Sequence, residues 1–235
     1  MSAKPTTVKR PYRRRLTSRT MIVCLPGPAK PELLPDLART ALADYDIATH
    51  SVVPHFAART WRGGQLVDRW QGLTCGGPLR LLDLERMRRQ TQAAATLQWQ
   101  WWRHVVADTR PAHPFWVFVD RYRADPGRYP LARARADYQA QPRLLAMSAF
   151  NAMPHKPCEL PTASLEAFQA GHSTYLNLAW LAAVPGDGLA IVDGPHSGLL
   201  TCDSERLADQ LTYLRAANEH LSRLDRQASV VAVAV

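Results

Sequence analysis

The chain has 235 residues, of which 46% are hydrophobic and 21% charged, and its 29 Lys and Arg residues outnumber 20 Asp and Glu residues to give a net charge of +9. These fractions are typical of a globular protein and exclude a disordered or fibrous chain. No apolar run approaches the roughly 18 residues that span a bilayer, so the sequence predicts no transmembrane segment and no membrane partner.

Residues 1–20 form a basic arm that we expect to be disordered. The arm contains seven Lys and Arg residues and no acidic residue, so it carries most of the net charge. Counterion release on contact with phosphates would give it affinity for nucleic acid, with Arg13, Arg14 and Arg15 as candidate contacts. Three other interpretations stay open: a solvated tail, an organellar transit peptide, or translation that starts at Met21 instead of Met1.

Residues 21–53 predict a strand–helix–strand unit. Met21–Leu25 is a short apolar strand, Pro31–Asp44 has apolar residues on one helical face, and Ile47–Val53 is a second strand that Pro54 ends. Such a βαβ unit implies a parallel pair of strands joined by a right-handed crossover.

The next segment, residues 61–78, contains two glycine pairs and is predicted to be a long loop, with residues 65–68 as one arm of a small hairpin. Leu81–Asp108 has the longest helical pattern of the chain. Phe115–Val119 is bulky and β-favouring, and it is predicted to be a buried strand that Asp120 closes.

The second half of the chain is mostly helical. Four helices are predicted there: Tyr129–Ala140, Pro142–Met153, Ser164–Val184 with an interruption at Gly171, and a last one that Ser204 caps.

Two further strands, Leu189–Val192 and Leu199–Cys202, flank the hairpin signal Asp193-Gly194. Val230–Val235 is either an edge strand or a frayed end. We therefore expect residues 21–235 to form a single α/β (or α+β) domain, with a short mixed sheet covered by several amphipathic helices and an N-terminal βαβ unit.

Familiar catalytic and nucleic-acid motifs are absent from the sequence. There is no GxxxxGK[ST], GxGxxG, HExxH, GxSxG or paired CxxC, which argues against P-loop, dinucleotide-binding, zincin and α/β-hydrolase families. The four cysteines are far apart and no secretory signal is present, so we expect reduced thiols and a cytoplasmic protein. His155 and Cys158 have a plausible ligand spacing, but the sequence does not show whether they converge with His172, His196 and Cys202 on a zinc ion. No metal ligand is therefore assigned, and the sequence does not identify a cofactor.

The segment whose residue types best suit catalysis or anion binding is residues 74–78 (TCGGP). Backbone N–H groups beside Gly76 and Gly77 could face an anion, and the Cys75 thiol could act as a nucleophile. Alternatively, the glycines make a turn and the cysteine is a small buried hydrophobe.

Three other residues are candidates for catalysis. His55 follows the second predicted strand, and Asp120 follows the predicted strand at 115–119, where α/β sheets place ligands. His172 is the third of these candidate catalytic residues. For Asp120, turn initiation is an equally supported interpretation.

Arginines alternate with aromatic residues in the loop region. Trp61, Arg62, Arg69 and Trp70 suit stacking on bases and pairing with phosphates, although the same residues serve as solvated surface. Besides the arm, the predicted phosphate or nucleic-acid contacts are Arg62, Gly63, Gly64, Gly76, Gly77 and Arg80.

These features lead to three functional hypotheses. The first is a nucleic-acid- or nucleotide-associated protein whose basic arm and Arg/Trp/Gly-rich loops bind phosphates. The second is an enzyme, a transferase or hydrolase acting on a phosphorylated or nucleoside substrate. The third is a non-catalytic interaction protein of a mobile element. The sequence does not decide whether the protein is an enzyme, nor its oligomeric state.

Overall fold

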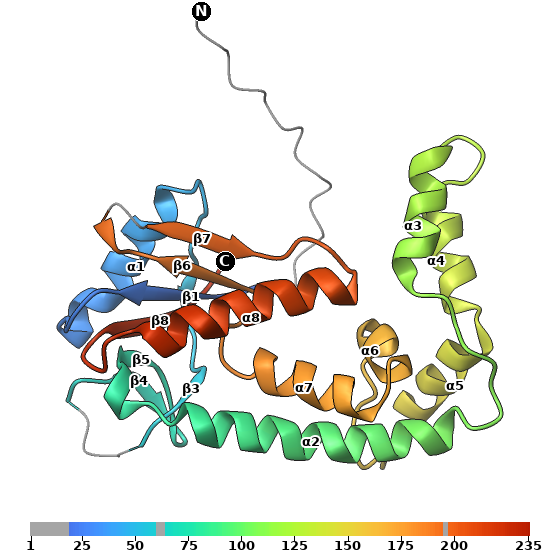
Figure 1. Cartoon of the computed structure of the whole chain (residues 1–235), viewed down its shortest axis with the longest axis horizontal. Coiled ribbons are helices and arrows are strands. Elements are labelled where there is room, and N and C mark those ends of the chain that lie inside the picture. Colours follow the sequence, from blue (N-terminus) through green and yellow to red (C-terminus); the bar gives the residue numbers. More distant parts are fainter. Residues whose placement is uncertain (1–18, 60–63, 195–196) are drawn as a thin grey trace, which may run out of the picture.

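The computed structural model describes residues 19–59, 64–194 and 197–235, and its centre is a mixed eight-stranded sheet (Figure 1). The strands are β1 (Thr20–Leu25), β2 (Ser51–Val52), β3 (Phe56–Ala57), β4 (Val67–Trp70), β5 (Leu73–Pro78), β6 (Gly188–Ile191), β7 (Gly198–Thr201) and β8 (Ser229–Ala234). The expected class, a single α/β domain with a short mixed sheet covered by helices, is confirmed.

Helices cover both faces of the sheet and extend beyond one end of it (Figure 1). They are α1 (Leu34–Ala43), α2 (Leu84–Val105), α3 (Phe115–Ala124), α4 (Leu131–Gln139), α5 (Pro142–Asn151), α6 (Leu165–Gln169), α7 (His172–Ala182) and α8 (Leu207–Arg223). Helix α1 buries its apolar stripe against one face, while α8 and the start of α2 cover the other. No helix among the described residues is long and apolar enough to cross a membrane.

The C-terminal strand β8 occupies the middle of the sheet. It pairs antiparallel with β1 along one edge and with β2 and β5 along the other. All six residues of β8 are buried, and all but Ser229 are valine or alanine. Such a composition is expected of a strand that is covered on both faces and has no side in contact with solvent. Both expectations for this segment, an edge strand or a frayed end, are therefore wrong.

The N-terminal unit has the predicted strand–helix order but not the predicted pairing. Thr20 of β1 and Ser51 of β2 both pair with Ala234 of β8, so the two strands run in one direction on opposite sides of β8. The unit is thus a split βαβ, and the parallel hydrogen-bonded partner of β1 is β6. Local patterns contain no information about a strand that inserts from the far end of the chain.

The predicted strand Phe115–Val119 is the first half of α3. Pro114 lies at the N-cap position with extended backbone angles, and the helix packs through Phe115 and Phe118 against Tyr138 of α4. The three-residue step between these two rings matches a helix, so packing on α4 overrides the β preference of the aromatic run. Asp120 consequently lies within a helix and not at the end of a strand.

Other helices follow the prediction closely. The segment from Ser164 divides at Gly171, which has a φ of +105°, into α6 and α7. The predicted cap of the last helix is wrong: Arg206 occupies the N-cap position of α8 without a side-chain cap, and the Ser204 hydroxyl accepts from the backbone N–H of Arg206 in the turn before the helix. Strands β6 and β7, which flank Asp193 and Gly194 in the sequence, form the predicted antiparallel pair.

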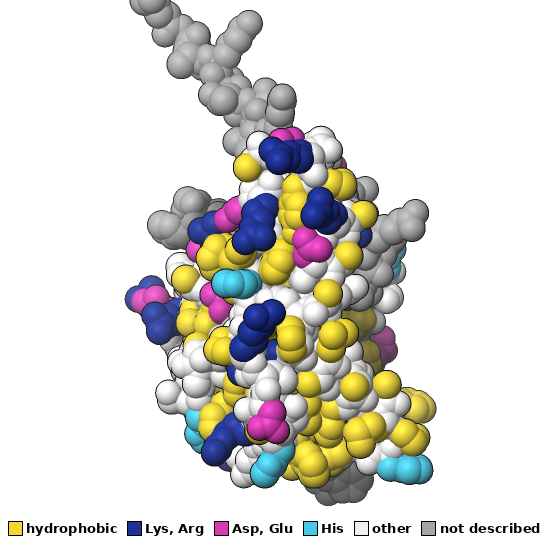
Figure 2. Space-filling model, turned by 90° about the vertical axis from the view of Figure 1, so that its right-hand side faces the viewer, with side chains coloured by type: hydrophobic (Ala, Val, Ile, Leu, Met, Phe, Trp, Pro, Cys, Tyr) yellow, Lys and Arg dark blue, Asp and Glu magenta, His cyan; other side chains and the backbone are white. Residues whose placement is uncertain are grey.

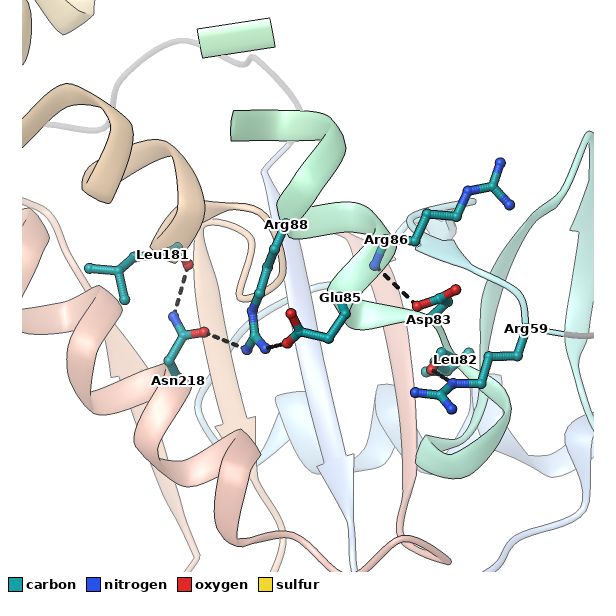
Figure 3. Close-up of polar contacts among 8 residues, drawn as sticks. All are labelled: Arg59, Leu82, Asp83, Glu85, Arg86, Arg88, Leu181 and Asn218. Atoms are coloured by element: carbon teal, nitrogen blue, oxygen red, sulfur yellow. Dashed lines mark hydrogen bonds and ion pairs between the residues drawn. The ribbon is translucent and has the colours of Figure 1, made fainter. Parts of the chain in front are cut away.

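A largely buried arginine joins three helices next to the sheet (Figure 3). Arg88 of α2 donates to the side chain of Asn218 on α8 and forms an ion pair with Glu85, while its guanidinium lies over the ring of Trp180 on α7. Asn218 also donates to the carbonyl oxygens of Leu181 and Leu214. This network holds the N-terminal part of α2 against α7 and α8.

Replacing Gly76 by Ala should destabilise the fold, because an added Cβ would collide with the carbonyl oxygen of Val230 and lie 2.7 Å from the Cα of Val231. Overpacking of this kind costs about 1–3 kcal/mol in the free energy of unfolding, measured by urea denaturation. Gly198→Ala is the matched control, since nothing lies within 4 Å of its added Cβ. Equal stability of the two variants would contradict the close β5–β8 approach.

The Asn218→Ala variant should lose about 1–3 kcal/mol of unfolding free energy, because it leaves the buried Leu181 carbonyl and the Arg88 guanidinium short of partners. Asn177→Ala, at an exposed position on α7, controls for the change in residue type. Thermal and urea unfolding measure both. A loss no larger than that of the control would show that the network does not hold the helices together.

Candidate functional site

Cys75 lies on β5 and not on a loop. Its side chain is 1% exposed and belongs to the core beneath α1. Burial, and secondarily the Asp68 carboxylate, raises the pKa of the thiol to about 11, so the thiol stays protonated at neutral pH. A protonated, enclosed thiol has the properties of a structural cysteine and not of a nucleophile.

Gly76 and Gly77 also lie within β5, so the predicted anion-binding loop at this point is wrong. Gly76 pairs with Val231 and Gly77 with Val230 of β8. A Cβ at Gly77, whose φ is +146°, would meet the Gln65 carbonyl oxygen at 2.8 Å. Close approach of neighbouring backbone, and not a ligand, requires glycine at both positions.

His55 links the strand region to the helical layer. Its Nε2 donates to the carbonyl oxygen of Val184, 2.9 Å away, just after α7. Burial lowers the pKa of the imidazole despite that hydrogen bond and the nearby Asp187, so the ring is neutral at pH 7. This is a satisfied structural histidine.

His172 and Asp120 lie in the helical part of the molecule. The His172 ring packs against Trp99 of α2, with 4.5 Å between centroids. Asp120 forms ion pairs with Arg206, at 3.0 Å, and with Arg123, at 3.3 Å, and so ties α3 to the start of α8.

The four predicted catalytic residues are therefore not brought together. In the described part of the chain, no hydrogen bond, ion pair or ring contact joins any two of Cys75, His55, His172 and Asp120. Nor does any group of three or more His, Cys, Asp or Glu residues lie in a metal-binding arrangement there.

The predicted phosphate contacts have mixed positions. Arg13, Arg14, Arg15, Arg62 and Gly63 lie outside the described residues, and Gly64 is exposed. Arg80 donates from Nε to the side chain of Gln227 and from Nη2 to that of Gln65, which holds the end of β5 against the start of β8.

The end of the molecule formed by α3, α4 and α5 carries charges of both signs, with six arginines and three aspartates in residues 115–151. Figure 2 shows this end with acidic and basic side chains next to one another and hydrophobic side chains gathered on its lower part. Two of these arginines form ion pairs within this end, Arg123 with Asp120 and Arg133 with Asp137. Neighbouring carboxylates reduce, without cancelling, the attraction of these arginines for a polyanion.

A groove of about 470 Å³ between α2 and α7 is also unsuited to phosphate. Its lining contains alanines and neutral polar residues, such as Gln90, Thr91 and Ser164, and no Lys or Arg. Two of its polar groups already bond each other, because the Tyr175 hydroxyl donates to Gln98.

The tip of the β4–β5 hairpin differs from these surfaces. Trp70 pairs with Leu73 across a two-residue turn, in which Gln71 has a φ of +49° and Gly72 a φ of +84°. Positive φ at both turn positions is the type I′ geometry that joins twisted strands tightly. The turn therefore fixes the backbone at Trp70 and the face of the hairpin from which its side chain leaves.

Trp70 is the most exposed large hydrophobic residue in the described part of the chain, at 66%, and its cross-strand neighbour Leu73 is 39% exposed. Large aromatic side chains normally bury most of their area, so an outward-facing tryptophan on a rigid turn is a typical feature of a binding surface.

A cleft of about 310 Å³ lies beside this tip and is lined by Arg59, Arg69 and Trp70 together with the turn. Its lining contains two arginines and no acidic residue. Among the described residues, neither guanidinium forms an ion pair with a carboxylate.

Arg59 is held in place from the start of α2 (Figure 3). Its backbone N–H donates to the Leu81 carbonyl and its Nε to the Leu82 carbonyl, at 3.1 Å. The next residue, Asp83, caps α2 by accepting from the backbone N–H of Arg86. The guanidinium is thus anchored through one nitrogen.

Sequence reasoning singled out Arg69 and Trp70 but missed Arg59, which lies just after β3. The Gln71-Gly72 dipeptide between Trp70 and Leu73 was the available hairpin signal. Nothing in the sequence indicates that β3 runs along the other side of β5 and brings Arg59 to the same cleft.

Comparisons with known proteins provide no further guide: no family model, no curated protein and no solved structure matches this chain.

In native protein, Cys75 and Cys24 should resist thiol labelling at pH 8, because both are buried and burial raises the pKa of both thiols. Cys158 and Cys202, which are partly exposed, should label first. Mass spectrometry of peptides before and after denaturation measures this order. Rapid labelling of Cys75 in folded protein would restore it as a candidate nucleophile.

Proposed function

We propose that this protein binds nucleic acid, with the β4–β5 hairpin tip as its principal contact. The observation that carries the proposal is the cleft in which exposed Trp70 lies with Arg59 and Arg69 and no acidic residue. Aromatic faces stack on bases and guanidinium groups pair with phosphates, so the two residue types together match the two parts of a nucleotide.

The charge distribution along the chain supports the same proposal. Residues 1–158 have a large excess of basic residues, whereas residues 159–235 have an excess of acidic ones. The hairpin belongs to the basic part. The arginines of the N-terminal arm would add phosphate contacts that are independent of sequence, because such contacts release counterions.

The enzyme hypothesis has weaker support. Its four candidate residues have separate structural partners, and Cys75 is enclosed in the core. An open platform with two cations is suited to holding a ligand more than to transforming one, since it presents no nucleophile or general base.

The variant Trp70→Ala should weaken binding of the full-length protein to a labelled oligonucleotide by about 5- to 150-fold, because stacking on an aromatic ring contributes about 1–3 kcal/mol per base. Fluorescence anisotropy at fixed salt measures the affinity. Trp101→Ala, at a partly exposed tryptophan of α2 outside the cleft, is the matched control. Equal effects of the two variants, or no effect of Trp70→Ala, would contradict the proposal.

A further inference from the structure

We infer that the hairpin cleft takes unpaired bases, so that its ligand is single-stranded nucleic acid. The inference rests on the proposed function and specifies its ligand. It depends on the register of three strands at the hairpin tip and on the chemistry of the cleft.

The hairpin tip does not project freely from the sheet. Ala57 of β3 pairs with Leu73 of β5, and the backbone N–H of Ala58 donates to the carbonyl oxygen of Gly72, 3.0 Å away. Strand β3 therefore accompanies the hairpin into its turn, and β4 and β3 lie on the two edges of β5.

This three-strand width is unsuited to groove reading in a duplex. A two-stranded ribbon fits the major groove of B-DNA, which is about 12 Å wide. Three strands spaced by about 4.8 Å span roughly 10 Å between backbone axes before their side chains are counted. The tip with its exposed Trp70 would therefore meet the outside of a duplex, where phosphates are accessible but base faces are not.

The residues of the cleft favour contact with a base face. Trp70 and Leu73 lie directly opposite each other in register, so their side chains share one side of the hairpin and form a joint apolar platform. Within a duplex, neighbouring bases cover both faces of each base. An unpaired base can be splayed out and laid on such a platform at little cost.

The two arginines complete the arrangement from either edge of β5. Arg69 comes from β4, and Arg59 follows β3 on the opposite edge. Arg69 is directly opposite Thr74, one step from the Trp70–Leu73 pair, so it belongs to the other face of the hairpin and lines the cleft from its rim. A strand whose base stacks on Trp70 would therefore find the Arg59 cation at one edge of β5 and the Arg69 cation around the opposite edge, each available to the flanking phosphates. The cleft holds no carboxylate that would repel them.

The test compares three labelled probes of equal length with full-length protein at one salt concentration: a single-stranded oligothymidylate, the same backbone without bases, and a blunt duplex. The intact single strand should bind about 5- to 150-fold more tightly than the abasic strand. The duplex should show no such advantage over the abasic strand. Trp70→Ala should abolish the advantage of the bases, while Trp70→Phe should retain most of it.

Two results would overturn the inference in distinguishable ways. If the duplex binds as tightly as the single strand, and Trp70→Ala weakens both equally, the ligand is not single-stranded but the proposed function survives. If no probe binds in a salt-dependent manner, both the inference and the proposed function fail. Thermal unfolding of each variant shows that the exposed position is replaced without loss of the fold.

Discussion

The fold depends on the insertion of the last strand, β8, into the middle of the sheet. Its residues pair with β1 on one side and with β2 and β5 on the other. The strands of the N-terminal third of the chain therefore form one continuous sheet only when β8 lies between them. Gly76 allows this close approach because any side chain there would collide with the backbone of β8. Such non-local pairing should make folding of the sheet slow, because loops that close over most of the chain must form first.

The candidate site depends on the same constraint. Strand β5 is held by β8 at its C-terminal half and by β3 and β4 at its N-terminal half, where the buried Thr74 hydroxyl donates to the carbonyl oxygen of Val67. The hairpin tip is therefore presented by a fixed frame. A ligand that stacks on Trp70 therefore does not have to order the backbone beneath it, and the tryptophan side chain has only two χ angles to fix.

Local patterns predicted much of the secondary structure, but not the pairing of distant segments. The helix before Asp44 and the β6–β7 hairpin were accessible because periodicity and turn residues are local signals. Phe115–Val119 was misassigned because contacts with Tyr138 on α4 decide its conformation. The candidate site was predictable in part, for the same reason. Arg69 and Trp70 adjoin a turn signal in the sequence, whereas Arg59 reaches the cleft only through the β3–β5 pairing.

The central claim, that the hairpin tip is the ligand-binding surface, is tested most directly by hydrogen–deuterium exchange of the full-length protein with and without saturating single-stranded oligonucleotide. The account predicts that ligand-dependent protection in the folded domain is concentrated in peptides covering Ala58, Arg59 and residues 67–73, with no change in α3 and α4. Protection confined to the α3–α4 end, or to the groove between α2 and α7, would contradict it.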